Sequence, residues 1–252
     1  MNILGVDVGG SGIKGAVVNT INGNLISERI RIPTPNPATP KKISQTIKNI
    51  CNELKWDGLI GISFPTVIKS GKAVQCGNLD PKCKGVQLDT FFELETGNKS
   101  FVINDADAAA LGIREFGEGK DQEGLVITIT IGTGIGSGVF FNGKLMSNFE
   151  LGRLYGKKGD IMESFSSDAA RKKNNWDYKK WGKRLNFFLD HIEKIFSPDL
   201  IILGGGVSKK LELYRNFINI KTPLIAAKLK NDAGIIGAAV FAKKMVDLSS
   251  KV

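Results

Sequence analysis

The chain has 252 residues, of which 42% are apolar, and it carries a formal net charge of +10. These values indicate a globular protein with a substantial core, organised as one large domain or two small ones. Every apolar run is interrupted by glycine or polar residues before it reaches membrane-spanning length, and no secretory leader is recognisable. We therefore expect a cytoplasmic protein that does not enter a membrane.

The N-terminal half is predicted to begin with an antiparallel meander and to continue with alternating helices and strands. The expected strands cover residues 2–8, 13–19, 25–32, 59–64 and 101–103, and the expected helices cover about 40–54 and 104–116. The proline-rich segment 33–40 predicts a surface loop. Residues 66–98 are expected to be irregular, apart from a hairpin turn at Ser70-Gly71.

The C-terminal half is predicted to repeat this plan, beginning with a second meander after residue 119. A polar, lysine-rich region at 156–175 follows it. Beyond this region we expect a helix at about 176–196, a strand at 200–203, a helix from Val207, a short strand near 222–226 and a final helix from about 232. The sequence therefore predicts a duplicated α/β architecture with a mixed sheet in each half.

The two meanders share a glycine-rich turn that carries one hydroxyl group. The first turn reads Asp7-Val-Gly-Gly-Ser-Gly and the second reads Ile131-Gly-Thr-Gly-Ile-Gly, and each copy ends in an Asn-Gly hairpin signal. Backbone N–H groups in such turns bind phosphate. Two matched turns therefore predict two related domains that bind a phosphoryl donor, and a third glycine run at 204–206 strengthens this interpretation.

Several familiar sites are excluded by what the sequence lacks. There is no Walker A motif, and both glycine turns lead into strands rather than helices, which excludes a Rossmann dinucleotide site. His191 is the only histidine, so acid–base catalysis would be the work of a carboxylate. The three cysteines lack a C-x-x-C pair, so we expect free thiols and no structural zinc.

The net charge of +10 permits two interpretations. It fits an anionic partner such as polyphosphate, nucleic acid or a membrane surface, or else a lysine-rich composition spread over solvated faces. Basic residues cluster at 171–173 and 179–184, but no DNA-recognition pattern accompanies them.

Carboxylates at the ends of predicted strands are the candidate catalytic and binding groups. Asp7 precedes the first glycine turn and is either a turn cap or an outer-sphere ligand of Mg²⁺. Asn104, Asp105 and Asp107 open a helix, where an aspartate can be a cap or a base beside an amide suited to sugar hydroxyls. Glu150 and Glu163 are either surface glutamates or acceptors for further hydroxyl groups.

Taken together, these motifs resemble the ROK family of sugar kinases, in the actin/hexokinase superfamily. The features that carry the resemblance are the two glycine turns, Asn104-Asp105, Glu150-Leu-Gly152, Leu203-Gly-Gly-Gly and Gly77-Asn78-Leu-Asp80. The match extends over essentially the whole chain and is nearest to the polyphosphate/ATP glucokinase branch. It implies two actin-like (ribonuclease H-like) α/β domains with mixed sheets and an interdomain cleft.

The resemblance also implies a role for each matching residue. Asp105 would be the general base for the 6-hydroxyl group of glucose or a related hexose, and Mg²⁺ would accompany a polyphosphate or ATP donor. The implied sugar-binding residues are Asn78, Asn104, Asp105, Glu150, Arg153 and Glu163. The implied phosphate- and nucleotide-binding residues are Asp7, Gly9, Gly10, Ser11, Gly12 and Lys14 at the first turn, Gly132, Thr133 and Gly134 at the second, and Gly204, Gly205 and Gly206 at the third.

One departure from the family pattern affects the expected substrate. The family has Glu-x-Gly-His, whereas this chain has Glu150-Leu-Gly152-Arg153, so a cation replaces a sugar-binding imidazole. Alternatives are therefore an impaired relative that acts as a sugar- or phosphate-binding regulator, or a kinase for another small metabolite.

We also expect a homodimer that does not bind DNA. The expected domains are 1–117, with the sugar site and first phosphate site, and 118–252, with the second phosphate site and nucleotide site. Whether the last helix, about 232–246, packs back on the first domain is left open.

Overall fold

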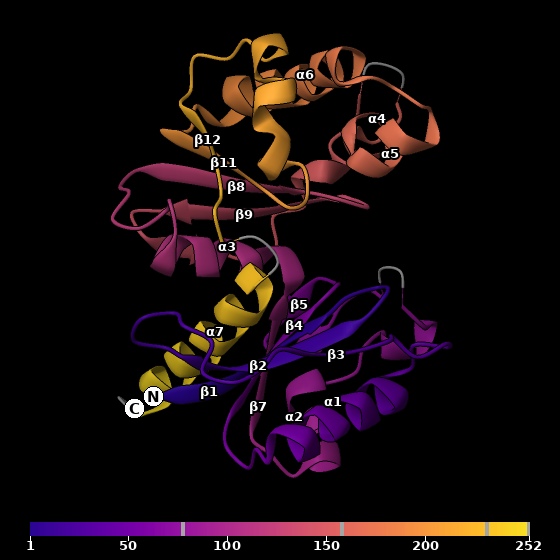
Figure 1. The fold of residues 1–252 in the computed structure, drawn as a ribbon, viewed down its shortest axis with the longest axis vertical. Helices are drawn as coiled ribbons and strands as arrows, with labels where there is room; N and C mark the ends of the chain where they lie inside the picture. Colours follow the sequence, from indigo (N-terminus) through magenta and orange to yellow (C-terminus); the bar gives the residue numbers. More distant parts are fainter. Residues whose placement is uncertain (77–78, 157–158, 230–231, 251–252) are drawn as a thin grey trace. The chain divides into compact units, whose positions relative to one another are not determined.

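The structure is a computed structural model that describes residues 1–76, 79–156, 159–229 and 232–250 (Figure 1). The chain forms two compact units. The first comprises Met1–Phe116 with Asp232–Val252, and the second comprises Gly117–Asn231. The first unit is therefore assembled from two separate parts of the chain.

Each unit contains a five-stranded mixed sheet with the same topology. The first sheet has the order β3-β2-β1-β4-β7 and the second has the order β10-β9-β8-β11-β12. In both sheets the first three strands along the chain form an antiparallel meander, and the two later strands are added in parallel. The sequence repeat thus corresponds to a structural repeat, which confirms the expected architecture.

The strands coincide with the apolar, β-branched segments of the sequence. In the first unit they are β1 (Asn2–Val8), β2 (Ile13–Asn19), β3 (Ile30–Ile32), β4 (Ile60–Phe64) and β7 (Ser100–Asn104), with a small hairpin of β5 (Ile68–Lys69) and β6 (Lys72–Ala73). In the second unit they are β8 (Leu125–Ile131), β9 (Ile135–Phe141), β10 (Lys144–Met146), β11 (Leu200–Gly204) and β12 (Leu224–Ala226).

The first sheet is covered by helices on both faces. Apolar side chains of α1 (Pro40–Leu54) and α2 (Leu88–Thr96) join those of the strands in one core cluster. On the other face lie α3 (Asp105–Phe116) and α7 (Ala233–Ser249), which contact each other along their lengths (Figure 1).

Glycines allow α7 to lie directly on the sheet. A Cβ atom at Gly5 or Gly61 would overlap the carbonyl oxygen of Ile235 or Ala238, respectively. A Cβ at Gly237 would overlap the backbone of α3 in the same way. The helix therefore packs backbone to backbone, and any larger residue at these positions would force it away from the sheet.

The second unit is built around the long helix α6 (Tyr178–Phe196), which buries one apolar face on its sheet. The ring of Trp181 lies edge-on to that of Tyr214, with 4.7 Å between centroids, and both side chains are buried. Two short helices, α4 (Met162–Ser166) and α5 (Asp168–Lys173), precede α6. The indole N–H of Trp181 donates to the carbonyl of Ser166 at the end of α4, at 2.9 Å.

The structure corrects several predicted elements. The segment 66–98 contains the expected hairpin turn at Ser70-Gly71, but it also contains the 3₁₀ turn η1 (Pro81–Cys83) and α2, and is not irregular. The expected strand 25–32 is reduced to β3 and a single bridge between Leu25 and Val18.

Corrections in the second unit also concern helices. The lysine-rich region holds two helices that were not expected there, α4 and α5. The helix expected from Val207 is replaced by the 3₁₀ turns η3 (Ser208–Leu213) and η4 (Arg215–Phe217), with a break at Lys210. Within the described ranges, no helix has both the length and the apolar character needed to cross a membrane.

Candidate active site

The first glycine turn joins β1 to β2 and leaves much of its backbone accessible. The N–H of Gly9 donates to the carbonyl of Gly12 at 3.1 Å, which closes the turn. Gly10 and Ser11 are exposed, and a Cβ at Gly10 would meet no atom within 4 Å. The turn has the open backbone that a phosphate group requires.

Asp7 and Lys14, both predicted at this turn, are bound to each other. They occupy paired positions on β1 and β2, and the Lys14 ammonium group donates to the Asp7 carboxylate at 3.0 Å. Ser63 on the parallel strand β4 donates to the other carboxylate oxygen at 2.9 Å. Gly234, near the start of α7, lies against the same carboxylate, because a Cβ there would be 3.2 Å from Oδ1. Asp7 therefore organises the turn rather than merely capping it.

The donor set at Asp7 fits an outer-sphere metal ion. Each carboxylate oxygen accepts one hydrogen bond, from Lys14 or Ser63, and retains acceptor capacity for a metal-bound water. Among the described residues, no three acidic, histidine or cysteine side chains gather as a candidate inner-sphere metal site. The remaining acceptor capacity of Asp7 fits Mg²⁺ held through water, and this role stays a prediction.

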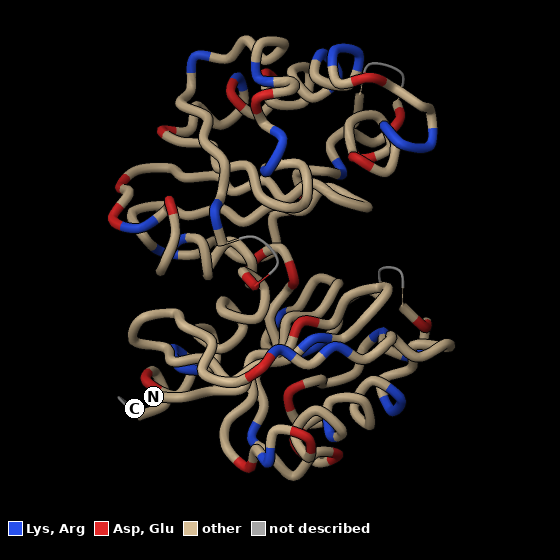
Figure 2. The backbone as a smooth tube through the Cα atoms, in the orientation of Figure 1, with Lys and Arg blue, Asp and Glu red and all other residues tan. Residues whose placement is uncertain are grey.

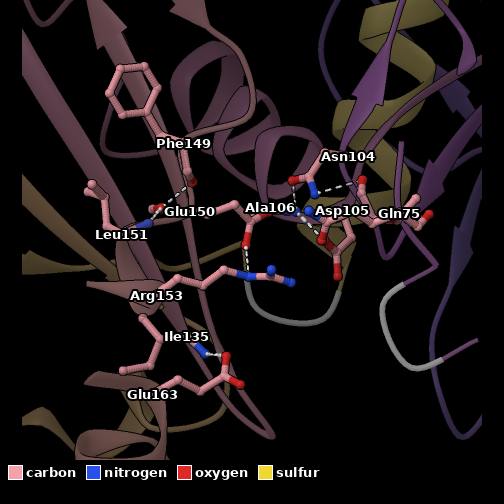
Figure 3. Close-up of polar contacts among 12 residues, drawn as sticks. Gln75, Asn104, Asp105, Ala106, Ile135, Phe149, Glu150, Leu151, Arg153 and Glu163 are labelled. Atoms are coloured by element: carbon pink, nitrogen blue, oxygen red, sulfur yellow. Dashed lines mark hydrogen bonds and ion pairs between the residues drawn. The ribbon is translucent and has the colours of Figure 1, made fainter. Parts of the chain in front are cut away.

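At the start of α3, Asn104 is the main capping residue. The buried Asn104 side chain accepts hydrogen bonds from the N–H groups of Ala106 and Asp107, at 2.9 and 3.0 Å, and donates to the carbonyl of Thr66 at 3.0 Å (Figure 3). Asp105 is only half-buried, and its Oδ1 accepts from the N–H of Ala106 at 2.9 Å. Because Asn104 accepts from the same N–H group and from the next one, capping of the helix does not require a carboxylate at position 105.

The second glycine turn, between β8 and β9, is also closed by a backbone hydrogen bond between glycines, but across one residue fewer than the first. The N–H of Gly132 donates to the carbonyl of Gly134 at 2.9 Å, and Thr133 is exposed at the tip. The carbonyl of Gly132 accepts from the N–H of Ala169 in the first turn of α5, at 3.1 Å. The start of α5 therefore fixes one side of this turn.

Glu163 fixes the other side of the second turn. Its carboxylate accepts from the N–H of Ile135 at 2.9 Å, and a Cβ at Gly134 would overlap Oε2 (Figure 3). Glycine at 134 thus makes room for the carboxylate. The residue predicted to bind sugar and the turn predicted to bind phosphate therefore lie against each other within the second unit.

Glu150 lies in the same unit, at the start of the 3₁₀ turn η2 (Leu151–Arg153). Its backbone is held by Ser137, whose hydroxyl donates to the carbonyl of Phe149 and accepts from the N–H of Leu151 (Figure 3). Arg153 Nε lies 3.4 Å from Glu150 Oε2. Burial raises the pKa of Glu150, the Arg153 guanidinium opposes this shift, and the negative charge of Glu163 adds to it.

The third glycine run follows β11. Gly205 has φ of +80°, and a Cβ there would overlap the carbonyl oxygen of Ile131 at the end of β8. Gly204 is buried, whereas a Cβ at Gly206 would meet no atom within 4 Å. This run therefore lies beside the strand that leads into the second glycine turn. Asn78, the remaining predicted sugar ligand, lies outside the described residues.

Three residues that support these turns were not found from the sequence. Ser63 donates to the carboxylate of Asp7, and Ser137 binds the backbone on both sides of Glu150. Arg31 on β3 donates to the carbonyl of Ser11 at 3.1 Å. Only the strand pairing, which places Arg31 opposite Lys14, could have indicated the last of them.

A duplicated mixed sheet with a glycine turn in each copy defines an α/β protein of the actin-like class. The sequence model of the ROK family matches residues 3–154, and the chain belongs to this family. The expected family is therefore confirmed.

Known relatives match nearly the full length of the chain. The polyphosphate glucokinase of Mycobacterium tuberculosis (strain ATCC 25618 / H37Rv) is 41% identical over 238 residues, which cover 94% of this chain and 89% of the relative. The solved inorganic polyphosphate/ATP-glucomannokinase from Arthrobacter sp. strain KM has a TM-score of 0.92 at 37% identity, covering 97% of this chain and 99% of that chain. A ROK family glucokinase from Streptomyces griseus, solved with glucose and AMPPNP, has a TM-score of 0.79 at 22% identity, covering 97% of this chain and 100% of that chain. At this identity the similarity shows the fold alone.

Proposed function

We propose that the protein is a hexose kinase that transfers a phosphoryl group from polyphosphate, ATP or both to the 6-hydroxyl group of glucose or a related hexose. Relatives at 37–41% identity over nearly the whole chain are a polyphosphate glucokinase and a polyphosphate/ATP-glucomannokinase, which supports both the donor class and the acceptor class.

The observation that carries the proposal is the position of Asp105. It directly follows β7, an edge strand of the first sheet, and begins α3; it is half-buried, while its neighbour Asn104 caps the helix N-terminus. A carboxylate placed in this way is suited to accept the proton of a hydroxyl group during phosphoryl transfer. We assign it the role of general base.

Glu150, Glu163, Asn104, Asn78 and Arg153 are our proposed contacts for the remaining sugar hydroxyl groups. Glu163 keeps one oxygen available, because only Oε2 accepts from the backbone of Ile135. Ser137 holds the backbone on both sides of Glu150, and the Glu150 carboxylate is paired with Arg153. Asn104 already makes three hydrogen bonds, so it has only one amide N–H left to donate to a sugar.

The two open glycine turns are our proposed phosphate sites, and the run at 204–206 is the proposed nucleotide contact. Backbone N–H groups and the hydroxyl groups of Ser11 and Thr133 would donate to phosphate oxygens. Asp7 would hold Mg²⁺ through water, and the ion, when bound, neutralises phosphate charge. Basic residues gathered on α5 and α6 (Figure 2) are suited to attract a long anionic donor.

The test is phosphoryl transfer by the purified protein, measured as hexose 6-phosphate in a coupled assay. Glucose, mannose and N-acetylmannosamine would each be paired with polyphosphate and with ATP, in the presence of Mg²⁺. Transfer to glucose or mannose from either donor is the expected result. Saturable hexose binding by calorimetry without transfer from either donor would instead support the regulator, and transfer to the amino sugar alone would support a different kinase.

Homodimer formation, cytoplasmic location and the absence of DNA or membrane binding remain predictions. Sedimentation at two protein concentrations would decide the first of them.

A further inference from the structure

A row of polar side chains crosses the first sheet beside the first glycine turn. Ser63, Asp7, Lys14 and Arg31 occupy directly paired positions on β4, β1, β2 and β3. Directly paired residues project from the same face of a sheet. Ser63 and Lys14 both donate to Asp7, so the row ends with Arg31 on the edge strand.

The guanidinium group of Arg31 lies flat against the turn. Its Nη2 donates to the carbonyl of Ser11 at 3.1 Å. A Cβ at Gly12 would be 2.9 Å from the Cζ, Nε and Nη2 atoms of Arg31, so glycine at this position leaves the space that the guanidinium occupies. Arg31 is nevertheless exposed, and its charge is accessible to a ligand at the turn.

The cation beside this turn, Lys14, and the neighbouring cation on the chain, Arg29, are already neutralised. Lys14 is paired with Asp7 at 3.0 Å, and Arg29 is paired with Asp232 at 2.6 Å. Across the part of the chain that the structure describes, no carboxylate forms an ion pair with Arg31. Of its five N–H donors, only one is used, by Ser11, and the rest can form the planar fork that matches phosphate oxygens.

We propose that Arg31 binds a phosphate group of the phosphoryl donor at the first glycine turn and thereby contributes to selection of a polyanionic donor. Arg31, rather than Lys14, supplies the net positive charge there, because Lys14 and Asp7 cancel each other. This inference rests on the proposed function only in identifying the bound phosphate as part of the donor.

The first experiment measures binding without catalysis. Inorganic tripolyphosphate and ATP would be titrated calorimetrically into the wild-type protein and the variants Arg31→Gln, Arg31→Lys and Arg29→Gln. Arg29→Gln is the matched control, because it removes the same charge two residues away from a cation that is already paired. Charge-assisted hydrogen bonds predict that Arg31→Gln weakens tripolyphosphate binding about 10- to 100-fold.

The controls separate this role from general electrostatics. Arg31→Lys should recover part of the affinity, because it keeps the charge but loses the fork, and Arg29→Gln should change affinity less than about threefold. Equal losses of tripolyphosphate affinity in Arg31→Gln and Arg29→Gln would show that only the overall charge matters, and would overturn the proposal. Unchanged binding in Arg31→Gln would overturn it as well.

The second experiment separates binding from mere support of the turn. In steady-state assays Arg31→Gln should raise the KM for the donor, while the KM for glucose and the denaturant midpoint stay at wild-type values. If Arg31 only braced the Ser11 carbonyl, kcat would fall with the donor KM unchanged, which would refute the proposal. A wild-type protein that binds tripolyphosphate but transfers nothing would refute the proposed function, while the calorimetry would still decide the role of Arg31.

Discussion

Replacing Arg153 with histidine removes a guanidinium group that is paired with Glu150, a proposed sugar ligand. The ion pair spans 3.4 Å, and the two side chains are 53% and 34% exposed. At such exposure the pair contributes only about 0.2–1 kcal/mol, so releasing Glu150 gains little by itself. The larger gain comes from the neutral imidazole, which offers a sugar hydroxyl an acceptor worth about 1–3 kcal/mol if buried. We expect the KM for glucose to fall about tenfold, which corresponds to about 1.4 kcal/mol.

The assay compares Arg153→His with Arg153→Met, a matched variant that removes the charge but provides no strong acceptor. The methionine variant should lower the KM for glucose by no more than about fivefold, the equivalent of releasing an exposed ion pair. Because Arg153 lowers the pKa of Glu150, both variants should also shift the acid limb of the pH profile to higher pH.

The reasoning would be refuted by a KM that is unchanged for every hexose in both variants. That result would mean that Glu150 and Arg153 leave the sugar untouched, and that their ion pair is a surface contact.

The remaining predictions concern catalysis, stability and donor attraction. Asp105→Asn should lower kcat about 10²- to 10⁴-fold with the fold retained, and near-normal turnover would eliminate Asp105 as the base. Burial raises the pKa of Asp89 from 3.8 to about 6, despite a hydrogen bond from the N–H of Val102. The folded state therefore holds a proton on Asp89 at pH values where the unfolded state has lost it. The free energy of unfolding should fall by about 1–2 kcal/mol as pH rises from 4 to 7. In urea titrations of Asp89→Asn, the free energy of unfolding should depend less on pH. If the basic residues serve polyphosphate, its KM should rise more steeply with salt than the KM for ATP, and equal responses would make the charge of +10 incidental.

The two meanders could be predicted because their signals are local. Apolar alternation, a glycine turn and an Asn-Gly hairpin lie within about twenty residues of each other, and the structure reproduces them as β1–β2 and β8–β9. The same signals placed Asp7, Lys14 and Thr133 at the turns. Their positions could therefore be predicted, although not the pairing of Lys14 with Asp7.

Elements that depend on distant contacts could not be predicted. Helix α2 lacks a side-chain cap and buries Phe92 against Phe64, whose rings are 5.9 Å apart, so its stability comes from packing across the chain. The segment after Val207, expected to be a helix, forms 3₁₀ turns instead. The hydroxyl of Tyr214 donates to the Val207 carbonyl there, at 3.0 Å. Glu163 lies against Gly134 from α4, a helix whose last residue, Ser166, accepts a hydrogen bond from Trp181. None of these contacts can be inferred from the spacing of residues along the sequence.

The return of α7 to the first unit has a consequence for how the protein is made. During synthesis the residues Gly117–Asn231 emerge as one uninterrupted stretch and can close their core before translation ends. The sheet that emerged earlier must wait, because only α3 lies on the face containing Gly5 and Gly61 until α7 leaves the ribosome. The middle of this chain is therefore expected to fold before its beginning, and a nascent protein stalled short of residue 233 would expose an apolar sheet face to chaperones or to aggregation.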